Sequence, residues 1–153
     1  TKAVHALGLR SSTAHIELLK TEDGWKVVEV GPRLGGFRHT LYKLAFGIDS
    51  SLNDILIHIP KPPIIPKKTK GHAAAMKIFA KTEGKIEKIK GFKKIQEIKS
   101  LHSFIQNKKT GDVVKFAKNG GKAVMSLTFF NKSRSKLLAD IRRFEQAIDI
   151  KVK

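Results

Sequence analysis

A cluster of prolines near the middle of the chain constrains its fold more than any other feature. Four of the five prolines in the 153-residue sequence lie between Pro60 and Pro66. Because proline has a fixed φ and no backbone N–H, this stretch can form neither the interior of a helix nor a central strand. We therefore expect a stiff linker rich in proline and lysine over residues 61–70, which separates a first part, 1–60, from a small α+β domain, 71–153.

The two parts differ in charge. Residues 1–60 hold 7 basic and 6 acidic side chains, whereas residues 61–153 hold 24 and 7, and the whole chain has a net charge of +18. A basic half is typical of proteins that bind nucleic acids. However, 25 of the 31 basic residues are lysines. They are scattered between apolar positions, as in residues 85–90, without an aromatic cluster for base stacking.

This lysine pattern is typical of solvated faces of strands and helices, and a lysine-rich proteome would produce it. We therefore expect that nucleic acid is not the partner. The alternative function is a basic module over residues 67–153 that binds nucleic acid or another polyanion without catalysis.

The composition excludes several classes of protein. With 41% hydrophobic and 29% charged residues the chain can bury a core. It has no cysteine, which excludes disulfide scaffolds, zinc ribbons and thiol catalysis. No apolar run approaches the roughly 20 residues that span a bilayer, and no signal peptide opens the chain, so we expect a cytoplasmic protein. The chain begins at Thr1 and its only methionines are Met76 and Met125, so we expect it to be a piece of a longer one.

Hydrophobic periodicity predicts an α+β fold. We expect helices over 1–8, 36–46, 50–59 and 133–148, and strands over 12–20, 25–31, 72–80, 84–90, 97–101, 122–130 and 150–152. The helices at 36–59 should cover a small antiparallel sheet formed by the first two strands. The apolar stripe of the second helix comprises Leu52, Ile55, Leu56 and Ile59. In the second part, one strand face carries Ala123, Met125, Leu127 and Phe129, and the last helix, capped by Ser133 or Ser135, has the stripe Leu137, Ile141, Phe144 and Ile148.

The first two strands form a predicted hairpin. A three-residue loop of Glu22, Asp23 and Gly24, with the glycine in the left-handed conformation, is a common closure. This closure pairs Thr21 with Trp25, Leu19 with Val27, Glu17 with Glu29 and His15 with Gly31. The opposite face then carries only the apolar side chains of Ala14, Ile16, Leu18, Val28 and Val30, which supports this register.

Glu17 and Glu29 would repel each other, because like charges directly opposite in a sheet destabilise it by up to about 1 kcal/mol. A divalent cation between them reverses that sign, and Mg²⁺ prefers one or two carboxylates together with substrate phosphates. The alternative is a solvent-exposed face on which both acids point into water.

The segment after the second strand favours the cation. Residues 29–36 leave the strand through a glycine-rich turn, with Arg33 four residues after Glu29. A guanidinium there can hold phosphate with two hydrogen bonds, although a surface ion pair is the alternative. Two acids for a metal and one arginine for phosphate are typical of a phosphoryl-transfer site.

These residues resemble the end of an ATP-grasp domain. The similarity lies in Ala6-Leu7-Gly8-Leu9-Arg10, in Ser12-Thr13-Ala14-His15-Ile16-Glu17 and in Glu29-Val30-Gly31-Pro32-Arg33-Leu34-Gly35-Gly36. The pattern is similar to that of biotin carboxylase, carbamoyl phosphate synthetase and, above all, the amino-acid ligases. It covers residues 1–60 with specific motifs and 61–153 only loosely, where the chain resembles the small C-terminal domain of those ligases.

The resemblance implies a site and a reaction. Glu17 and Glu29 would bind Mg²⁺ or Mn²⁺, with Glu29 bridging two ions, and Arg33 would hold the transferred phosphate of ATP or the acyl phosphate. A small carboxylate substrate would attack the γ-phosphate, and an amine would then displace phosphate. Many family members have Asn as a further metal ligand where this chain has Gly31, and the family often has a histidine where His15 stands.

The resemblance also implies which parts are missing. In the family, the lysines that hold the phosphates, a glycine-rich loop and the adenine pocket precede the segment seen here. We therefore expect the rest of the ligase to be the partner and this chain alone to be inactive. Residues Arg10 to Thr13 could line the acceptor pocket, and Arg38 and His39 could meet an anionic substrate or be ordinary exposed residues. A regulatory domain that keeps an inherited hairpin without chemistry is a further alternative.

Overall fold

The chain divides after Thr69 into two units, Thr1–Thr69 and Lys70–Lys153. The structure is a computed structural model and describes residues 2–153. Residues 61–70 contain neither helix nor strand, as expected for a proline-rich segment. Within the described residues, no helix combines the length and the apolar character that crossing a membrane requires.

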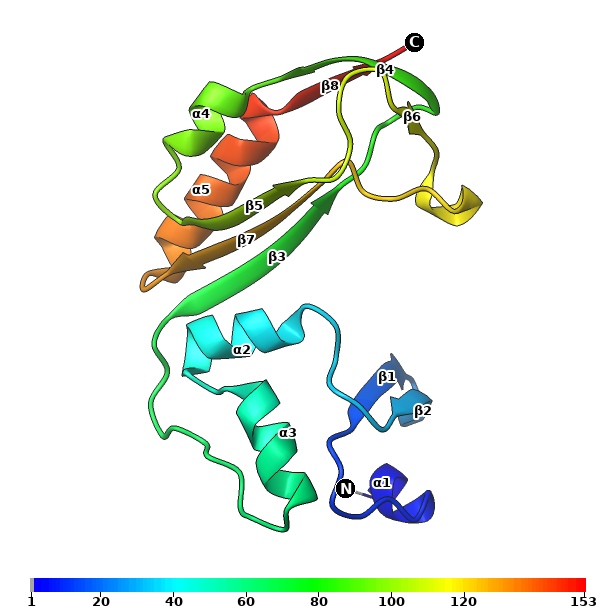
Figure 1. Cartoon of the computed structure of the whole chain (residues 1–153), viewed down its shortest axis with the longest axis vertical. Coiled ribbons are helices and arrows are strands. Elements are labelled where there is room, and N and C mark those ends of the chain that lie inside the picture. The colour runs from blue at the N-terminus through cyan, green and yellow to red at the C-terminus, as the bar shows by residue number, and fades with distance from the viewer. Residues whose placement is uncertain (1) are drawn as a thin grey trace. The chain divides into compact units, whose positions relative to one another are not determined.

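In residues 2–69, the described part of the first unit, the chain forms one hairpin and three helices (Figure 1). Its elements are α1 (Lys2–Ala6), β1 (His15–Thr21), β2 (Gly24–Gly31), α2 (Arg38–Phe46) and α3 (Ser50–His58). Helix α2 ends at Gly47, whose φ of 73° is the left-handed conformation that glycine adopts without strain. Asp49 is the N-cap of α3, and its carboxylate accepts the Leu52 N–H at 3.1 Å. The end of α2 and the start of α3 therefore carry signals that are visible in the sequence.

The apolar stripe predicted for α3 does not face the interior. The side chains of Leu52, Ile55 and Ile59 are exposed, whereas Asn53 is buried. Asn53 donates to the Ile64 carbonyl at 3.0 Å and accepts the Ile64 N–H at 2.8 Å. The polar side of α3 thus faces the proline-rich segment, because Asn53 satisfies a backbone donor and a backbone acceptor that proline neighbours cannot pair.

The prediction that α2 and α3 cover the hairpin is also wrong. Leu18 and Val28, on the face expected to be apolar and buried, are 52% and 64% exposed. Val27, which pairs with Leu18, and Leu19, on the other face, are exposed as well. A two-stranded hairpin is marginally stable by itself, so both of its faces offer apolar surface for further packing.

The second unit contains two three-stranded antiparallel sheets, with strand orders β3-β7-β5 and β6-β4-β8 (Figure 1). The strands are β3 (His72–Ile78), β4 (Gly84–Lys90), β5 (Leu101–Gln106), β6 (Val113–Val114), β7 (Met125–Asn131) and β8 (Asp149–Val152). The helices are α4 (Phe92–Gln96), the short 3₁₀ helix η1 (Ala117–Asn119) and α5 (Arg134–Ala147). Strands β3, β4, β7 and β8 and helix α5 lie at their predicted places within a few residues.

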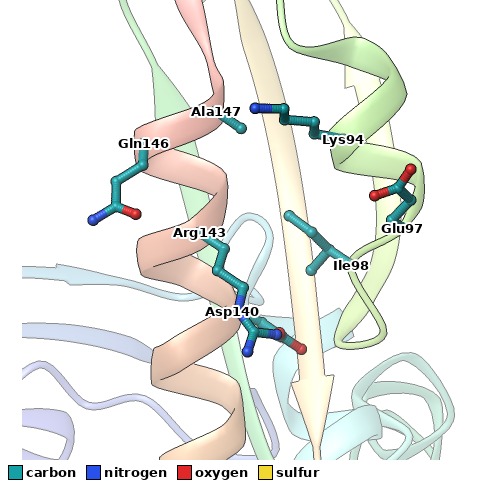
Figure 2. A pocket seen from close by; sticks show the side chains of 7 residues that line it. All are labelled: Lys94, Glu97, Ile98, Asp140, Arg143, Gln146 and Ala147. Atoms are coloured by element: carbon teal, nitrogen blue, oxygen red, sulfur yellow. The ribbon is translucent and has the colours of Figure 1, made fainter.

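The strand predicted over residues 97–101 is wrong, because α4 precedes this stretch and β5 follows it. Ser100, the last residue before β5, is fixed by a tertiary contact with the buried carboxylate of Asp140 on α5. Asp140 accepts the Ser100 hydroxyl at 2.6 Å, the Ser100 N–H at 3.1 Å and an Arg143 N–H at 3.0 Å. Figure 2 shows Asp140 and Arg143 on α5 facing the α4 side of the unit. No local pattern specifies such a contact.

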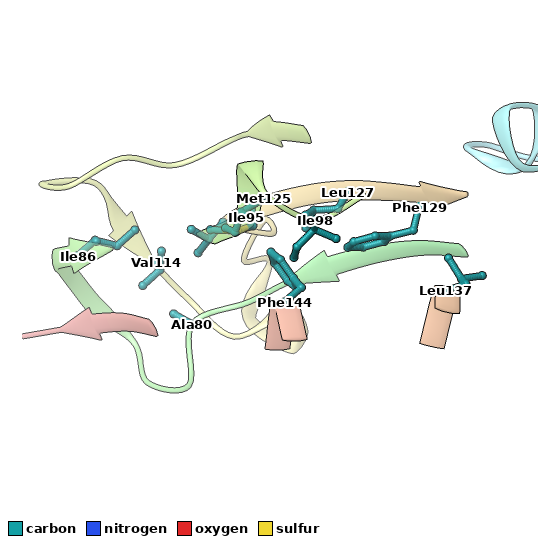
Figure 3. Packing of buried hydrophobic residues seen from close by; sticks show 11 residues of the cluster. Ala80, Ile86, Ile95, Ile98, Val114, Met125, Leu127, Phe129, Leu137 and Phe144 are labelled. Carbon is teal, nitrogen blue, oxygen red and sulfur yellow. The ribbon is translucent and has the colours of Figure 1, made fainter. Parts of the chain in front are cut away.

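The core of the second unit lies between α5 and the sheet that contains β7 (Figure 3). The predicted inner face of β7 is confirmed, since Met125, Leu127 and Phe129 are buried. The predicted stripe of α5 is confirmed too, with Leu137 and Phe144 buried. The rings of Phe129 and Phe144 meet edge to face at 5.8 Å between centroids. The Ser133 hydroxyl caps α5 by accepting the Lys136 N–H at 3.4 Å.

Truncating the central ring should destabilise this unit. We expect Phe144→Ala to lower the free energy of unfolding by about 3–5 kcal/mol, because it removes a fully buried ring and leaves a cavity. The neighbouring exposed position supplies the control, and Glu145→Ala should change it by no more than about 0.5 kcal/mol. Urea unfolding followed by circular dichroism measures both, and equal effects would contradict the assigned core.

A carboxylate outside the core should make stability depend on pH. The Phe116 N–H at 2.8 Å, and then the Asn119 side-chain amide at 2.6 Å, hold the pKa of Glu83 below its ordinary value of 4.5. A lowered pKa in the folded state stabilises the fold above the unfolded pKa, and this contribution disappears as pH falls through the folded value. We therefore expect the midpoint of unfolding to decrease as the pH is lowered below about 5. In Glu83→Gln the midpoint should decrease less steeply over the same pH range. Glu145→Gln is the matched control, and equal slopes for the two variants would refute the role of Glu83.

Candidate functional site

The turn of the β1–β2 hairpin is tighter than predicted. Thr21 pairs with Gly24 instead of Trp25, and the Thr21 hydroxyl donates to the Gly24 carbonyl at 2.9 Å. Gly24 has a φ of 104°, so the prediction of a glycine with positive φ in this turn is confirmed. The predicted pairing of Thr21 with Trp25 is wrong. As a consequence Leu19 pairs with Lys26, and the predicted Leu19–Val27 pair is wrong.

A β-bulge between Glu17 and Leu18 then restores the predicted register at the site. Leu18 pairs with Val27 and Glu17 with Glu29, so Val28 is the extra residue. Without the bulge, the register of the turn would place Glu17 opposite Val28. The Glu17–Glu29 and His15–Gly31 pairs are therefore confirmed, but through an irregularity that the sequence did not reveal.

Glu17 has a histidine neighbour on its own strand. The His15 Nε2 atom lies 3.3 Å from Glu17 Oε1, and the His15 side chain is only 14% exposed, against 49% for Glu17. The His15 ring packs against Gly35, where an added Cβ would lie 2.9 Å from Nδ1. Gly35 thus permits the glycine-rich turn to approach His15, and the histidine in turn restrains Glu17.

Glu29 has an arginine neighbour. The Arg33 Nη2 atom lies 3.9 Å from Glu29 Oε1, and both side chains are more than half exposed. The other terminal nitrogen of Arg33 donates to the Leu34 carbonyl at 3.2 Å. The ion pair is long and solvated, so its contribution to stability is small. The guanidinium consequently has donors available for a ligand next to the two glutamates.

Two hollows adjoin these residues and share Ala14, His15, Arg38 and Tyr42. One, of about 310 Å³, also reaches Thr13, Arg33 and Gly35 and has a mostly apolar lining. The other, of about 590 Å³, reaches Glu17. The predicted metal ligands, the predicted phosphate ligand and a place for a small molecule are therefore adjacent in this unit.

The residues predicted to contact the substrates, Arg10 to Thr13, Arg38 and His39, do not all lie at these hollows. Arg38 and Thr13 line a hollow, and the Thr13 hydroxyl donates to Asp54 at 2.6 Å. In contrast, the exposed His39 donates from Nδ1 to the Gly36 carbonyl at 2.7 Å and lines neither hollow. Arg10 lines a separate hollow beside α1. The structure thus brings Arg38 and Thr13, but neither His39 nor Arg10, to the candidate site.

The metal-ligating potential of the site rests on two carboxylates. Within residues 2–153 there is no group of three or more His, Cys, Asp or Glu side chains placed to hold a metal ion. Any cation at Glu17 and Glu29 would therefore take its other ligands from water, from substrate phosphates or from protein outside this chain, as Mg²⁺ commonly does.

A hollow in the second unit lies between α4 and α5, lined by Lys94, Glu97, Arg143 and Gln146, among others (Figure 2). Its buried acid, Asp140, is fully engaged with Ser100 and Arg143. The sequence held one signal for this structural role, since Asp140 follows Leu137 by three residues on the buried side of α5. The buried acid of this hollow therefore serves the fold and is not free for chemistry.

Comparisons with known proteins identify the fold. No family model and no curated protein matches the sequence. Among solved structures, an L-amino acid ligase from Bacillus licheniformis matches with a TM-score of 0.77 and 22% identity, over 99% of this chain and 38% of that one. A phosphoribosylglycinamide synthetase from Anaerococcus prevotii matches with a TM-score of 0.73 and 16% identity, over 99% of this chain and 40% of that one.

An N5-carboxyaminoimidazole ribonucleotide synthetase from Thermotoga maritima matches with a TM-score of 0.64 and 17% identity, over 99% of this chain and 40% of that one. The chain therefore has the fold of the matched part of these ligases and synthetases. The predicted fold class is thereby confirmed. The chain spans about two fifths of the length of the solved chains it matches, so the activity of a whole ligase is a matter for proposal.

Proposed function

We propose that this chain is part of an ATP-dependent carboxylate–amine ligase and supplies the residues around the transferred phosphate. Residues 1–60 would complete an ATP-grasp domain and residues 71–153 would form the small domain that follows it. The fold supports this proposal, and one observation carries it, namely that Glu17 pairs with Glu29 across the hairpin with Arg33 beside them. Because the reaction would consume ATP, we place the complete protein in the cytoplasm.

The site fits a magnesium ion chemically. Glu17 and Glu29 provide hard oxygen donors from neighbouring strands, and their side chains are accessible, with 49% and 59% exposure. The cation would reverse the repulsion between the two carboxylates. When bound, Mg²⁺ or Mn²⁺ offsets negative charge on the β- and γ-phosphates, where charge builds up during phosphoryl transfer.

In the proposed reaction a carboxylate oxygen of the small substrate attacks the γ-phosphorus of ATP. The bond to the β,γ-bridging oxygen breaks, and ADP leaves. Arg33 would donate hydrogen bonds to the transferred phosphoryl group and then to the acyl phosphate. An amine next attacks the acyl carbon, inorganic phosphate leaves, and the amine loses a proton. His15, by its contact with Glu17, would keep that carboxylate oriented toward the cation.

Glu29 should be essential in the complete ligase. We expect Glu29→Gln to lower kcat by about 10²- to 10³-fold, the usual loss when a group that stabilises the transition state is removed. It should also raise the Mg²⁺ concentration that gives half-maximal activity, because the amide carries no charge. Initial rates of phosphate release measured over a Mg²⁺ titration test both effects.

Glu22→Gln, in the turn of the same hairpin, is the matched control for charge and should leave both quantities unchanged. Full activity of Glu29→Gln would show that the hairpin is an inherited bystander. Binding of Mn²⁺, followed by its electron paramagnetic resonance signal, provides a readout that does not depend on turnover.

The 153-residue chain alone should not hydrolyse ATP. Arg33 and the two glutamates would bind only the phosphate end of the nucleotide, and in the proposed family the phosphate-binding lysines, the glycine-rich loop and the adenine pocket lie in the preceding part. We expect phosphate release by the purified chain at the level of a buffer blank containing Mg²⁺. Phosphate release that requires the chain and disappears in Arg33→Met would contradict the expectation that the preceding part of the ligase is needed for ATP hydrolysis.

A further inference from the structure

Four lysines face one another across β4 and β8, which lie side by side in Figure 1. Lys88 pairs directly with Lys151. Lys85 and Lys153 exchange both backbone hydrogen bonds, each at 2.9 Å, so they too are directly opposite. We call Lys85, Lys88, Lys151 and Lys153 the lysine ladder.

The lysine ladder occupies the outer face of this sheet. Ile86, on the inner face, is 1% exposed, and Ile89 and Ile150 are packed against the same core. All four lysines, in contrast, are exposed. Two successive like-charged pairs therefore point into solvent from one face.

The acids nearby, all within the described residues, form no ion pair with the lysine ladder. Asp149 pairs with Lys90 across the strands, and the Asp112 carboxylate accepts the Lys109 N–H at 2.9 Å. Glu87 is the bulge residue between the two lysine pairs, each of which we call a rung of the ladder. For the described part of the chain, no carboxylate oxygen comes within 4.0 Å of any ladder ammonium.

In the lysine ladder, as at Glu17 and Glu29, like charges lie directly opposite each other on paired strands, but here the charges are positive. Like charges directly opposite each other destabilise a sheet, and a ligand of opposite charge removes that penalty. We propose that this face binds the phosphodiester backbone of a double-stranded nucleic acid, independently of base sequence. The amino-acid sequence alone disfavoured such a partner because its lysines are scattered, but the pairing of β4 with β8 gathers them.

The geometry favours a chain of phosphates over other anions. Because Glu87 is the extra residue on β4, only two residues of β8 separate the two lysine pairs, which therefore follow each other along the strands at about 7 Å. Two pairs in a row suit successive phosphates of one backbone. Amphipathic helices that bind membrane surfaces insert large apolar side chains into the lipid, and the ladder has no such side chains. Binders of single strands stack bases on aromatic rings, which the ladder also lacks, so the duplex backbone is the better match.

The experiment compares two double variants of the 153-residue chain. In Lys88→Gln/Lys151→Gln one rung is removed, and in Lys93→Gln/Lys136→Gln the same net charge is removed from exposed positions on α4 and α5. Binding of fluorescently labelled duplex DNA and duplex RNA of mixed sequence is followed by anisotropy between about 50 and 200 mM NaCl.

We expect the original chain to bind both duplexes, with an affinity that falls steeply with salt. Losing one rung should reduce the slope of log affinity against log salt by about 1.8, which corresponds to two phosphate contacts. The control variant should keep most of the slope. Because the change relieves repulsion, the rung variant should also unfold at a temperature no lower than the original chain.

Three outcomes would overturn the proposal. The first is no duplex binding at about 50 mM salt. The second is an equal loss in both double variants, which would mean attraction by net charge alone. The third is stronger ladder-dependent binding to vesicles containing phosphatidylserine than to either duplex. If the rung variant fails to fold, Lys151→Gln alone gives the same comparison with an expected slope change of about 0.9. No ladder residue belongs to the proposed ligase site, so either proposal can fail without the other.

Discussion

The β-bulge between Glu17 and Leu18 decides what the first unit can do. The turn closes on Thr21 and Gly24, and that register would set Glu17 against Val28. One extra residue on β2 shifts the pairing, so that Glu17 faces Glu29 instead. The site with Arg33 and His15 around it depends on this single irregularity, because the two glutamates have to share one face before they can share a ligand.

Charged and polar side chains have two separate uses in this chain. Buried polar groups serve the fold: Asn53 holds the backbone of Ile64, and Asp140 holds Ser100. In the described residues no buried side-chain nitrogen or oxygen lacks a hydrogen-bond partner. Like charges that face each other, by contrast, stand on exposed strand faces, where they cost stability unless a ligand of opposite charge arrives. Glu17 with Glu29, and the lysine ladder, are both groups of this second kind.

The two units also differ in how their apolar side chains are used. The second unit has a core in which Phe129, Phe144 and Met125 are buried completely. In the first unit Leu18, Val28 and Ile55 remain at least half exposed. Exposed apolar surface of this extent is typical of sites that pack against more protein. This agrees with the finding that the solved structures of the same fold continue well beyond the matched 38–40% of their chains.

The sequence by itself determined the features that depend on local alternation and on special residues. The inner face of β7, the stripe of α5 and the proline-rich break follow from periodicity of two or 3.6 residues and from prolines and glycines. The family resemblance rested on the same short motifs, and the fold comparison agrees with it.

Only the tertiary structure decided the features that depend on distant partners. It placed the bulge in β1–β2, turned Asn53 and not Ile55 of α3 inward, and joined Ser100 to Asp140 on α5. It also paired Lys88 with Lys151, far apart in the chain. The physical reason is the same in each case: a local pattern specifies which face a side chain occupies, but its partner across the strands or between helices is chosen by the packing of the whole unit.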